Sequence, residues 1–348
     1  MGMRVAVVGV TGAVGAEMLR ILEERSFPVD ELIALASARS AGVTVRFAGE
    51  DVRVGELSLE ALRGVDLSLS AAGASVAKAF AREAAAAGTV CIDKSSAFRM
   101  DADVPLVVPE VNPEALEGSP RLIAVPNCTT IVAVMALAPL HRAAGLRSVV
   151  LSSYQAVSGA GRDGTRELAE QMLKLHDQVE ELARPDVDSL PVGDTFGKPI
   201  AFNVLPRIDG FESDGSTGEE AKTIQESRKI LGIPDLDVAA TCVRVPVPVG
   251  HSVSLLARFQ RAISPEEARA LLVEAPGVEL RDDPSNDVYP SPLEAAGRDE
   301  VLVGRIRPAG DHEDALQLFA CGDNLRKGAA LNGIQIAERL FPTARPSL

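Results

Sequence analysis

The chain has 348 residues, 46% of them hydrophobic and 24% charged, which is typical of a folded globular protein and excludes a collagen-like, coiled-coil or disordered chain. Acidic residues outnumber basic ones by 49 to 35, and the net charge of −14 disfavours nucleic acid as a partner, although a local site for a small anion remains compatible with it. No apolar run is as long as the ~18 residues of a membrane span, so no membrane association is expected.

The first half of the chain alternates strand-like and helix-like segments. Short apolar runs rich in β-branched residues predict strands at residues 3–9, 31–37, 66–73, 89–93 and 121–127. Amphipathic or apolar stretches predict helices at residues 16–27, 74–88 and 129–145. Strands that alternate with helices indicate a parallel, doubly wound sheet of the Rossmann type.

The pattern changes after Gly145. Longer strand-like runs at residues 147–159, 238–260 and 313–324 have fewer helices between them, which predicts an α+β domain with a mixed or antiparallel sheet. Residues 185–218 are rich in proline and glycine and are expected to form a long loop. Residues 327–341 predict a helix that packs back on the first domain.

A glycine turn follows the first strand and precedes the first helix. Gly9, Gly12 and Gly15 are small enough for the backbone to approach a pyrophosphate, and the helix N-terminus favours its negative charge. At the end of the second strand, Arg39 lies between serines and no acidic residue is present, which favours the 2′-phosphate of NADP over NAD. The alternative for Arg39 is a solvated loop arginine. The predicted cofactor contacts in this half are Gly9, Thr11, Gly12, Ala13, Val14, Gly15, Ser37, Arg39, Ser40 and Gly73.

Cys128 lies where a predicted parallel strand meets a predicted helix. A cysteine in a first helical turn is close to free backbone N–H groups, which favour the thiolate, so Cys128 is a candidate nucleophile, the alternative being a small buried side chain. Cys91, Cys242 and Cys321 lie in apolar strands and are expected to be buried and inert. With no CxxC pair, neither a metal site nor a disulfide framework is expected, and reduced thiols predict a cytoplasmic location.

Seven local motifs, in order over nearly the whole chain, resemble the aspartate-β-semialdehyde dehydrogenase family. They are GVTGAVG, SSAFR, PNCTT, YQAVSGAG, EEAK, CVRVPVPVGHS and GDNLRKGAALN. The resemblance implies NADPH-dependent reduction of L-aspartyl-4-phosphate to the semialdehyde and phosphate, on the pathway to diaminopimelate, lysine, methionine and threonine. It implies that Cys128 forms a thioester, that His251 is the acid/base and that Gln155 orients the substrate. An ordinary histidine pKa of about 6.5 suits that acid/base role, although His251 and Gln155 are also explained as satisfied structural residues.

By the same resemblance, Arg244 binds the substrate carboxylate. It lies seven residues before His251, an odd offset that would point the two side chains to opposite faces of one straight strand. Pro246, Pro248 and Gly250 interrupt the run, so a bend is expected that lets both side chains reach one site. The alternative for Arg244 is an ordinary surface or ion-pairing arginine.

The resemblance also assigns the remaining polar groups of the substrate. Glu219 would meet the ammonium group, and Lys222 and Arg99 would bind the phosphate, with Asn127 beside them. The alternative is that Ser216 to Glu219 is a helix capping box and that Glu219 and Lys222 form an ordinary helical pair. Further cofactor contacts, near the nicotinamide, are expected from Ser158, Gly159 and Asn324.

These inferences predict three segments. They are an NADP-binding Rossmann domain at residues 1–127, a catalytic, substrate-binding and dimerisation domain at 128–327, and a C-terminal helix at 328–348 that packs back on the first domain. A homodimer or a dimer of dimers is expected. The alternatives are a related acyl-phosphate reductase, such as N-acetyl-γ-glutamyl-phosphate reductase, and an inactive NADP-binding regulatory paralogue.

Overall fold

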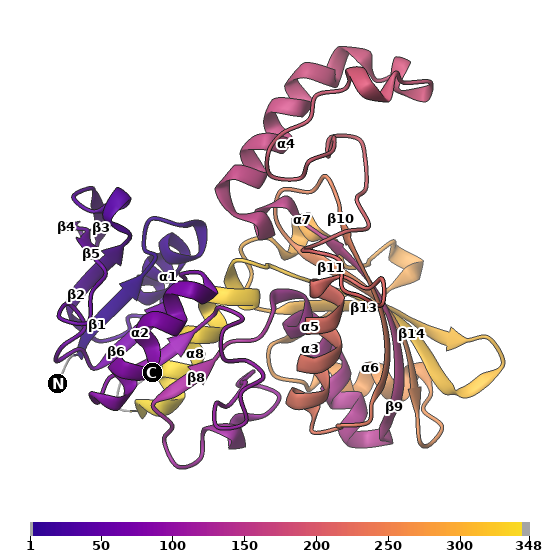
Figure 1. Ribbon diagram of the computed structural model, residues 1–348. Helices are drawn as coiled ribbons and strands as arrows, with labels where there is room; N and C mark the ends of the chain where they lie inside the picture. The colour runs from indigo at the N-terminus through magenta and orange to yellow at the C-terminus, as the bar shows by residue number, and fades with distance from the viewer. Residues whose placement is uncertain (1–2, 343–348) are drawn as a thin grey trace. The chain divides into compact units, whose positions relative to one another are not determined.

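The computed structural model describes residues 3–342, which fall into two compact units (Figure 1). Unit 1 comprises the chain up to Ala138, the segment Gln225–Asp235 and the chain from Leu325 onward. Unit 2 comprises Pro139–Ile224 and Leu236–Asn324. The described part of the predicted C-terminal helix therefore belongs to the same unit as the N-terminal half.

Unit 1 is built around a parallel six-stranded sheet in the order β5-β2-β1-β6-β7-β8, which confirms the predicted doubly wound sheet. Its strands are β1 (Met3–Val8), β2 (Val29–Ala36), β5 (Gly55–Glu56), β6 (Leu67–Ser70), β7 (Val90–Asp93) and β8 (Leu122–Ala124). The central strands are buried and apolar because helices pack against the sheet. A small antiparallel hairpin, β3 (Thr44–Phe47) with β4 (Glu50–Arg53), was not predicted.

The helices of unit 1 are α1 (Ala13–Glu24), α2 (Ala74–Ala86) and α8 (Leu331–Leu340), the last preceded by a π-helical turn at Arg326–Ala330. Two arginines tie the C-terminal segment to α1: Arg326 pairs with Glu24 at 2.7 Å, and Arg25 pairs with Glu338 at 2.7 Å. These ion pairs place the described part of the C-terminal segment against α1 within unit 1.

Helix α3 (Cys128–Ala144) begins in unit 1 and ends in unit 2. Residues 129–138 are all buried, as expected for a helix that is apolar on every face. Pro139 lies inside the helix, where it lacks the N–H that an ordinary residue would donate to the preceding turn.

Unit 2 contains a mixed six-stranded sheet in the order β10-β9-β11-β14-β13-β12, as predicted. The strands are β9 (Leu146–Gln155), β10 (Asp237–Arg244), β11 (His251–Phe259), β12 (Val278–Leu280), β13 (Val301–Ala309) and β14 (His312–Gly322). Strand β9 pairs with β10 in parallel and with β11 in antiparallel orientation. The run at residues 238–260 is therefore two strands, separated by a bend that contains Pro246, Pro248 and Gly250.

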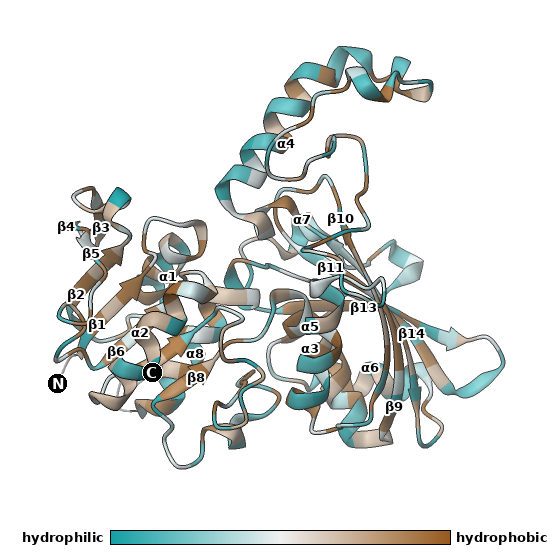
Figure 2. Ribbon diagram, in the orientation of Figure 1, coloured by the Kyte–Doolittle hydropathy of each residue, from teal (hydrophilic) through white to brown (hydrophobic). Residues whose placement is uncertain are grey.

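Unit 2 also carries α4 (Gly161–Leu175), α5 (Gly218–Leu231, which ends in unit 1), α6 (Pro265–Val273) and the short α7 (Pro292–Ala295). Helix α4, largely hydrophilic in Figure 2, was not predicted. The segment from Pro185 up to α5 is irregular apart from one short 3₁₀ turn, which confirms the predicted loop. Within residues 3–342, no helix combines the length and apolar character needed to cross a membrane.

Candidate active site

The glycine turn in unit 1 has the geometry of a phosphate-binding turn. Gly9 has a φ of +79°, and its N–H donates to Leu35 O at 2.8 Å, which joins the ends of β1 and β2. A Cβ at Gly15 would lie 2.3 Å from Gly9 O, so only glycine lets α1 start this close to the turn. Gly12 is the N-cap of α1, and no side chain caps that end, which leaves backbone N–H groups for an anion.

The other predicted cofactor contacts of unit 1 lie at neighbouring strand ends. Ser37, Arg39 and Ser40 follow β2, within or next to a short 3₁₀ turn at Ala38–Ser40. Arg39 is exposed and forms no ion pair within residues 3–342. Gly73 is the N-cap of α2, again without a side-chain cap, and a Cβ there would meet nothing within 4 Å.

Of the four cysteines, Cys128 differs from the others as predicted. It is the first residue of α3, at the carboxyl end of β8, and it is partly exposed. The other three are buried, and burial raises the pKa of the Cys91, Cys242 and Cys321 thiols to about 12. Cys128 is therefore the thiol best placed to react.

Unit 1 brings Arg99 and Asn127 close to the start of α3. The Asn127 Oδ1 accepts hydrogen bonds from the N–H groups of Thr129 at 2.8 Å and Thr130 at 3.4 Å, which makes Asn127 a helix cap. Arg99 is buried and pairs with Glu226 at 2.8 Å, and Glu226 also accepts from the N–H of Asn127 at 2.6 Å. Glu226 was missed, because a helical glutamate carries no local sequence signal for such a contact.

In unit 2, the peptide group of Ala156 lies between two predicted site residues. Its N–H donates to His251 Nδ1 at 3.1 Å, and its carbonyl oxygen accepts from Arg244 Nη1 at 2.7 Å. The bend after β10 therefore brings Arg244 and His251 to one place, as expected. Because Nδ1 accepts this bond, the neutral ring carries its proton on Nε2, which is buried without a partner within residues 3–342.

His251 differs electrostatically from the expectation. It is fully buried, and burial, with a smaller effect of the Arg244 charge, holds the pKa of His251 well below 6.5. The ordinary pKa assumed from the sequence is therefore wrong, because removal from water disfavours the imidazolium. The ring is neutral around pH 7.

Gly159 is placed where His251 and Arg244 come together. A Cβ at this position would lie 2.7 Å from Arg244 Nη1 and 3.2 Å from His251 Nε2. Its neighbour Ser158 exchanges hydrogen bonds with the Asn324 side chain, from whose Nδ2 it accepts at 3.0 Å. Asn324 Oδ1 also accepts from the N–H of Gly250, next to His251, at 2.9 Å. Unit 2 thus gathers the predicted nicotinamide contacts around the histidine.

Gln155 and Glu219 are also brought together in unit 2. The Gln155 Nε2 donates to Glu219 Oε1 and to Ser153 Oγ, each at 3.2 Å. Glu219 is 5% exposed, and its Oε2 lies 3.7 Å from Lys222 Nζ. Lys222 also pairs with Asp209.

The alternative interpretation of Glu219 as part of a capping box is wrong. The box is formed one residue later: Thr217 N–H donates to Glu220 Oε2 at 2.7 Å, and Glu220 N–H donates to Thr217 Oγ1 at 3.4 Å. Glu220 additionally accepts from the N–H of Cys242 at 2.9 Å. The cap therefore uses Glu220 and leaves Glu219 for Gln155 and Lys222.

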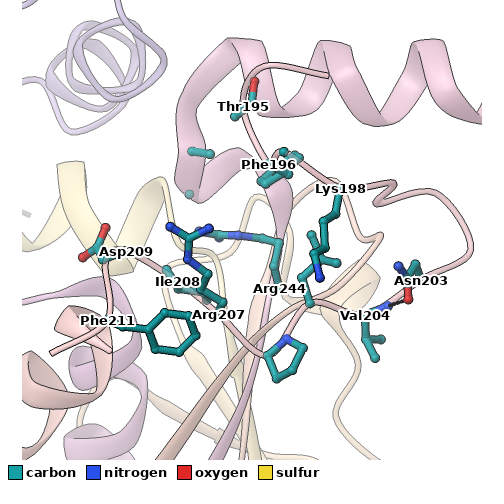
Figure 3. A pocket seen from close by; sticks show the side chains of 15 residues that line it. Thr195, Phe196, Lys198, Asn203, Val204, Arg207, Ile208, Asp209, Phe211 and Arg244 are labelled. Carbon is teal, nitrogen blue, oxygen red and sulfur yellow. Dashed lines mark hydrogen bonds between the residues drawn. The ribbon is translucent and has the colours of Figure 1, made fainter. Parts of the chain in front are cut away.

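A cavity of about 790 Å³ in unit 2 opens beside Gly159 and Arg244 (Figure 3). Its lining includes Lys198, Arg207 and Arg244 but only one acidic residue, Asp209. Arg244 stacks over the Phe196 ring at 5.9 Å, and Arg207 stacks over Phe211 at 5.6 Å. An acidic protein therefore has a locally cationic cavity suited to a small anion.

Two family models and several relatives match the chain. Residues 4–119 match the NAD binding domain of semialdehyde dehydrogenases, and residues 137–327 match their dimerisation domain. The aspartate-semialdehyde dehydrogenase of Bacillus subtilis is 49% identical over 341 residues, which is 97% of each chain.

Solved structures of aspartate-semialdehyde dehydrogenases are also similar. Enzyme II of Vibrio cholerae, complexed with ASA, has a TM-score of 0.91 and 42% identity over 98% of this chain and 99% of its own. The enzyme of Candida albicans, solved with NADP, has a TM-score of 0.74 and 25% identity over 98% and 99%.

The parallel nucleotide-binding sheet, the mixed second sheet and the two domain models together define the semialdehyde dehydrogenase class. With 49% identity to a curated relative over nearly its full length, the chain belongs to the aspartate-semialdehyde dehydrogenase family, which confirms the resemblance predicted from its motifs.

Proposed function

We propose that this chain catalyses the NADPH-dependent reductive dephosphorylation of L-aspartyl-4-phosphate to L-aspartate-4-semialdehyde, in the biosynthesis of diaminopimelate, lysine, methionine and threonine. The family supplies the reaction class, and the Vibrio cholerae relative was solved with ASA bound. The partly exposed Cys128, the first residue of α3, is the observation that connects this reaction with a particular residue of the chain.

The residues at the glycine turn fit NADP. The uncapped N-terminus of α1 and the close approach enforced by Gly15 suit a pyrophosphate, and the exposed Arg39 suits a 2′-phosphate. The Candida albicans relative was solved with NADP. When bound, the cofactor supplies the hydride.

Cys128 carries the covalent chemistry. Its thiolate attacks the acyl carbon, a C–S bond forms, and the acyl–oxygen bond breaks so that phosphate leaves with the electron pair. After hydride reaches the thioester carbonyl, the resulting thiohemiacetal collapses, the aldehyde leaves, and the thiolate is restored. His251 Nε2 is the group of unit 2 that we assign to the proton on the substrate oxygen.

The charged ends of the substrate are assigned to four side chains. Arg244, on the cationic cavity, binds the α-carboxylate, and the buried Glu219, held by Gln155, binds the ammonium group. Lys222 and Arg99 bind the phosphate. Within residues 3–342, three of the five N–H groups of Arg99 donate to Glu226 and to two carbonyl oxygens, so two remain for a ligand.

The match to a dimerisation domain supports assembly as a homodimer. We propose that residues 1–127 serve cofactor binding and that residues 128–327 serve substrate binding and dimerisation. Of the C-terminal helix predicted at 328–348, residues 343–348 lie outside the described residues. The assembly is a homodimer or a dimer of such dimers, and the proposed location is cytoplasmic.

The reaction is tested most directly in reverse. L-Aspartate-4-semialdehyde, phosphate and NADP are mixed with the protein, and the absorbance of NADPH is followed, with NAD in a parallel reaction. Phosphate-dependent formation of NADPH is expected. Turnover only with N-acetyl-glutamate semialdehyde would assign the substrate of the related reductase instead. No NADPH formation with either semialdehyde would contradict the enzymatic proposal.

Arg39→Ala is expected to raise the KM for NADP at least about tenfold and to leave the KM for NAD nearly unchanged, because it removes a charged hydrogen bond to the 2′-phosphate alone. Initial rates with each nucleotide check this. Arg46→Ala, an exposed arginine with only a 3.8 Å pair to Asp51, is the matched control. An equal rise of the KM for NADP and for NAD would contradict the assignment of Arg39 to the 2′-phosphate.

Gly159→Ala is expected to lower kcat/KM about 10- to 100-fold in a protein that still folds. Its methyl group must displace the buried Arg244 guanidinium, which is held by Ala156 O, or the His251 ring. Gly210→Ala is the control, because a Cβ there meets nothing within 4 Å. Undiminished turnover of Gly159→Ala would show that the two side chains need not keep these positions.

A further inference from the structure

The segment after β7 carries a lysine to which no motif pointed. Lys94 directly follows Asp93, the last residue of β7, which lies between β6 and β8 in the sheet of unit 1. Its N–H donates to Ser70 O of β6 at 3.1 Å, and Val125 N–H, just beyond β8, donates to Asp93 O at 2.8 Å. Lys94 thus lies at the carboxyl edge of the parallel strands, the edge from which the chain enters α3.

Arg99 holds Lys94 and the chain before Cys128 together. Its Nη2 donates to Lys94 O at 2.7 Å and its Nε donates to Val125 O at 2.9 Å. The paired carboxylate of Glu226 continues this link by accepting the N–H of Asn127. A buried ion pair therefore fixes the position of residue 94 relative to the residues that precede the nucleophile.

The ammonium group of Lys94 has an unusual charge environment. The side chain is partly buried, and within residues 3–342 it forms no hydrogen bond or ion pair with a carboxylate. Burial lowers the pKa of Lys94, and the like charge of Arg99 lowers it further; the Cys128 thiolate is the strongest influence that raises it, followed by Asp93. The nearby Asp93 is turned to another partner: its Oδ2 accepts from Ser95 Oγ at 2.5 Å, and burial raises its own pKa.

The N-terminus of α3 alone has few free backbone N–H groups to stabilise a Cys128 thiolate. Asn127 already occupies the N–H groups of Thr129 and Thr130, two of the free donors that a thiolate in the first turn would use. Coupling between two charges is reciprocal, so a thiolate that stabilises an ammonium group is stabilised by it to the same extent.

We propose that Lys94 is a positioning residue of the reaction: its ammonium group holds Cys128 as the thiolate before the acyl phosphate arrives. The inference rests on the proposed role of Cys128 as nucleophile. A partly buried cation that pairs with no carboxylate within residues 3–342 costs stability, and its electrostatic coupling to the reacting thiol gives it a task that explains this cost.

The test is the pH dependence of Cys128 alkylation by iodoacetamide in the absence of substrate. Lys94→Met is expected to raise the pH midpoint of alkylation by about one pH unit or more and to slow alkylation several-fold near neutral pH. Lys94→Arg keeps the charge and is expected to restore most of the shift. Lys78→Met, an exposed lysine on α2, is the matched control and leaves the midpoint unchanged.

The signal belongs to Cys128 because the other thiols are buried, with pKa values of about 12, and Cys128→Ala sets the background. Thermal unfolding verifies that each variant is folded, and Lys94→Gln replaces Lys94→Met if the latter is not. An unchanged midpoint in the neutral variants overturns the proposal, even if the KM for phosphate rises. Turnover by Cys128→Ala would instead contradict the covalent mechanism itself, so the two failures are distinguishable.

Discussion

Replacing Cys128 with alanine is expected to abolish phosphate-dependent oxidation of the semialdehyde, with a loss of at least about 10⁴-fold, while the affinity for NADP stays close to that of the wild type. The loss is large because no thioester forms without the sulfur atom, and alanine offers no other nucleophile. Cofactor affinity is retained because the glycine turn, α1 and Arg39 lie on other elements of unit 1. Initial rates of NADPH formation and NADP titration by fluorescence or calorimetry measure the two quantities.

Cys91→Ala is the matched control. Cys91 lies in β7 of the same unit, buried, and its raised pKa makes it an inert thiol. Its replacement is expected to change activity little and stability by about 1 kcal/mol, as is usual for a small core substitution. Measurable turnover in Cys128→Ala, or an equal loss in Cys91→Ala, would disprove the assignment of the nucleophile.

His251→Gln is expected to lower kcat by about 10²–10³-fold, the usual contribution of a positioned proton-transfer group, with a smaller change in the KM for the semialdehyde. The ring is fully buried, and its Nε2, close to Gly159, has no hydrogen-bond partner among the described residues. His312→Gln, an exposed position in β14, is the control and should retain full activity.

The same variant should alter how stability depends on pH. Because burial holds the pKa of His251 well below 6.5 in the folded protein, the unfolded chain binds more protons as the pH falls through 6.5. The free energy of unfolding of the wild type therefore decreases toward acid in this window and levels off above it.

His251→Gln removes this proton linkage, so its stability should decrease less steeply than that of the wild type between about pH 7 and pH 5. His141, whose pKa is also lowered, is present in both proteins and cancels in the difference. Urea unfolding at several pH values measures the slopes. Parallel slopes would mean that His251 is accessible to protons in the folded state.

Local patterns in the sequence determined the fold class, the glycine turn, the position of Cys128 at a strand–helix junction and the family. These features depend on residues that are neighbours in the sequence. The spacing of apolar residues distinguishes strands from helices, and Gly9, Gly12 and Gly15 act within one turn. For the same reason α4 was missed, since only Leu168 and Leu175 among its five buried residues are apolar. The bend after β10 was predicted because prolines and glycine act locally on the backbone.

Only the tertiary structure decided the electrostatic state of the site residues. The neutral state of His251 follows from its burial and from the N–H of Ala156, which lies 95 residues away in sequence. The pairing of Arg99 with Glu226, across 127 residues, and the electrostatic coupling of Lys94 to Cys128 are likewise products of chain packing. Desolvation and charge coupling depend on distance in space, and no local pattern of residues encodes which distant groups the fold will bring together.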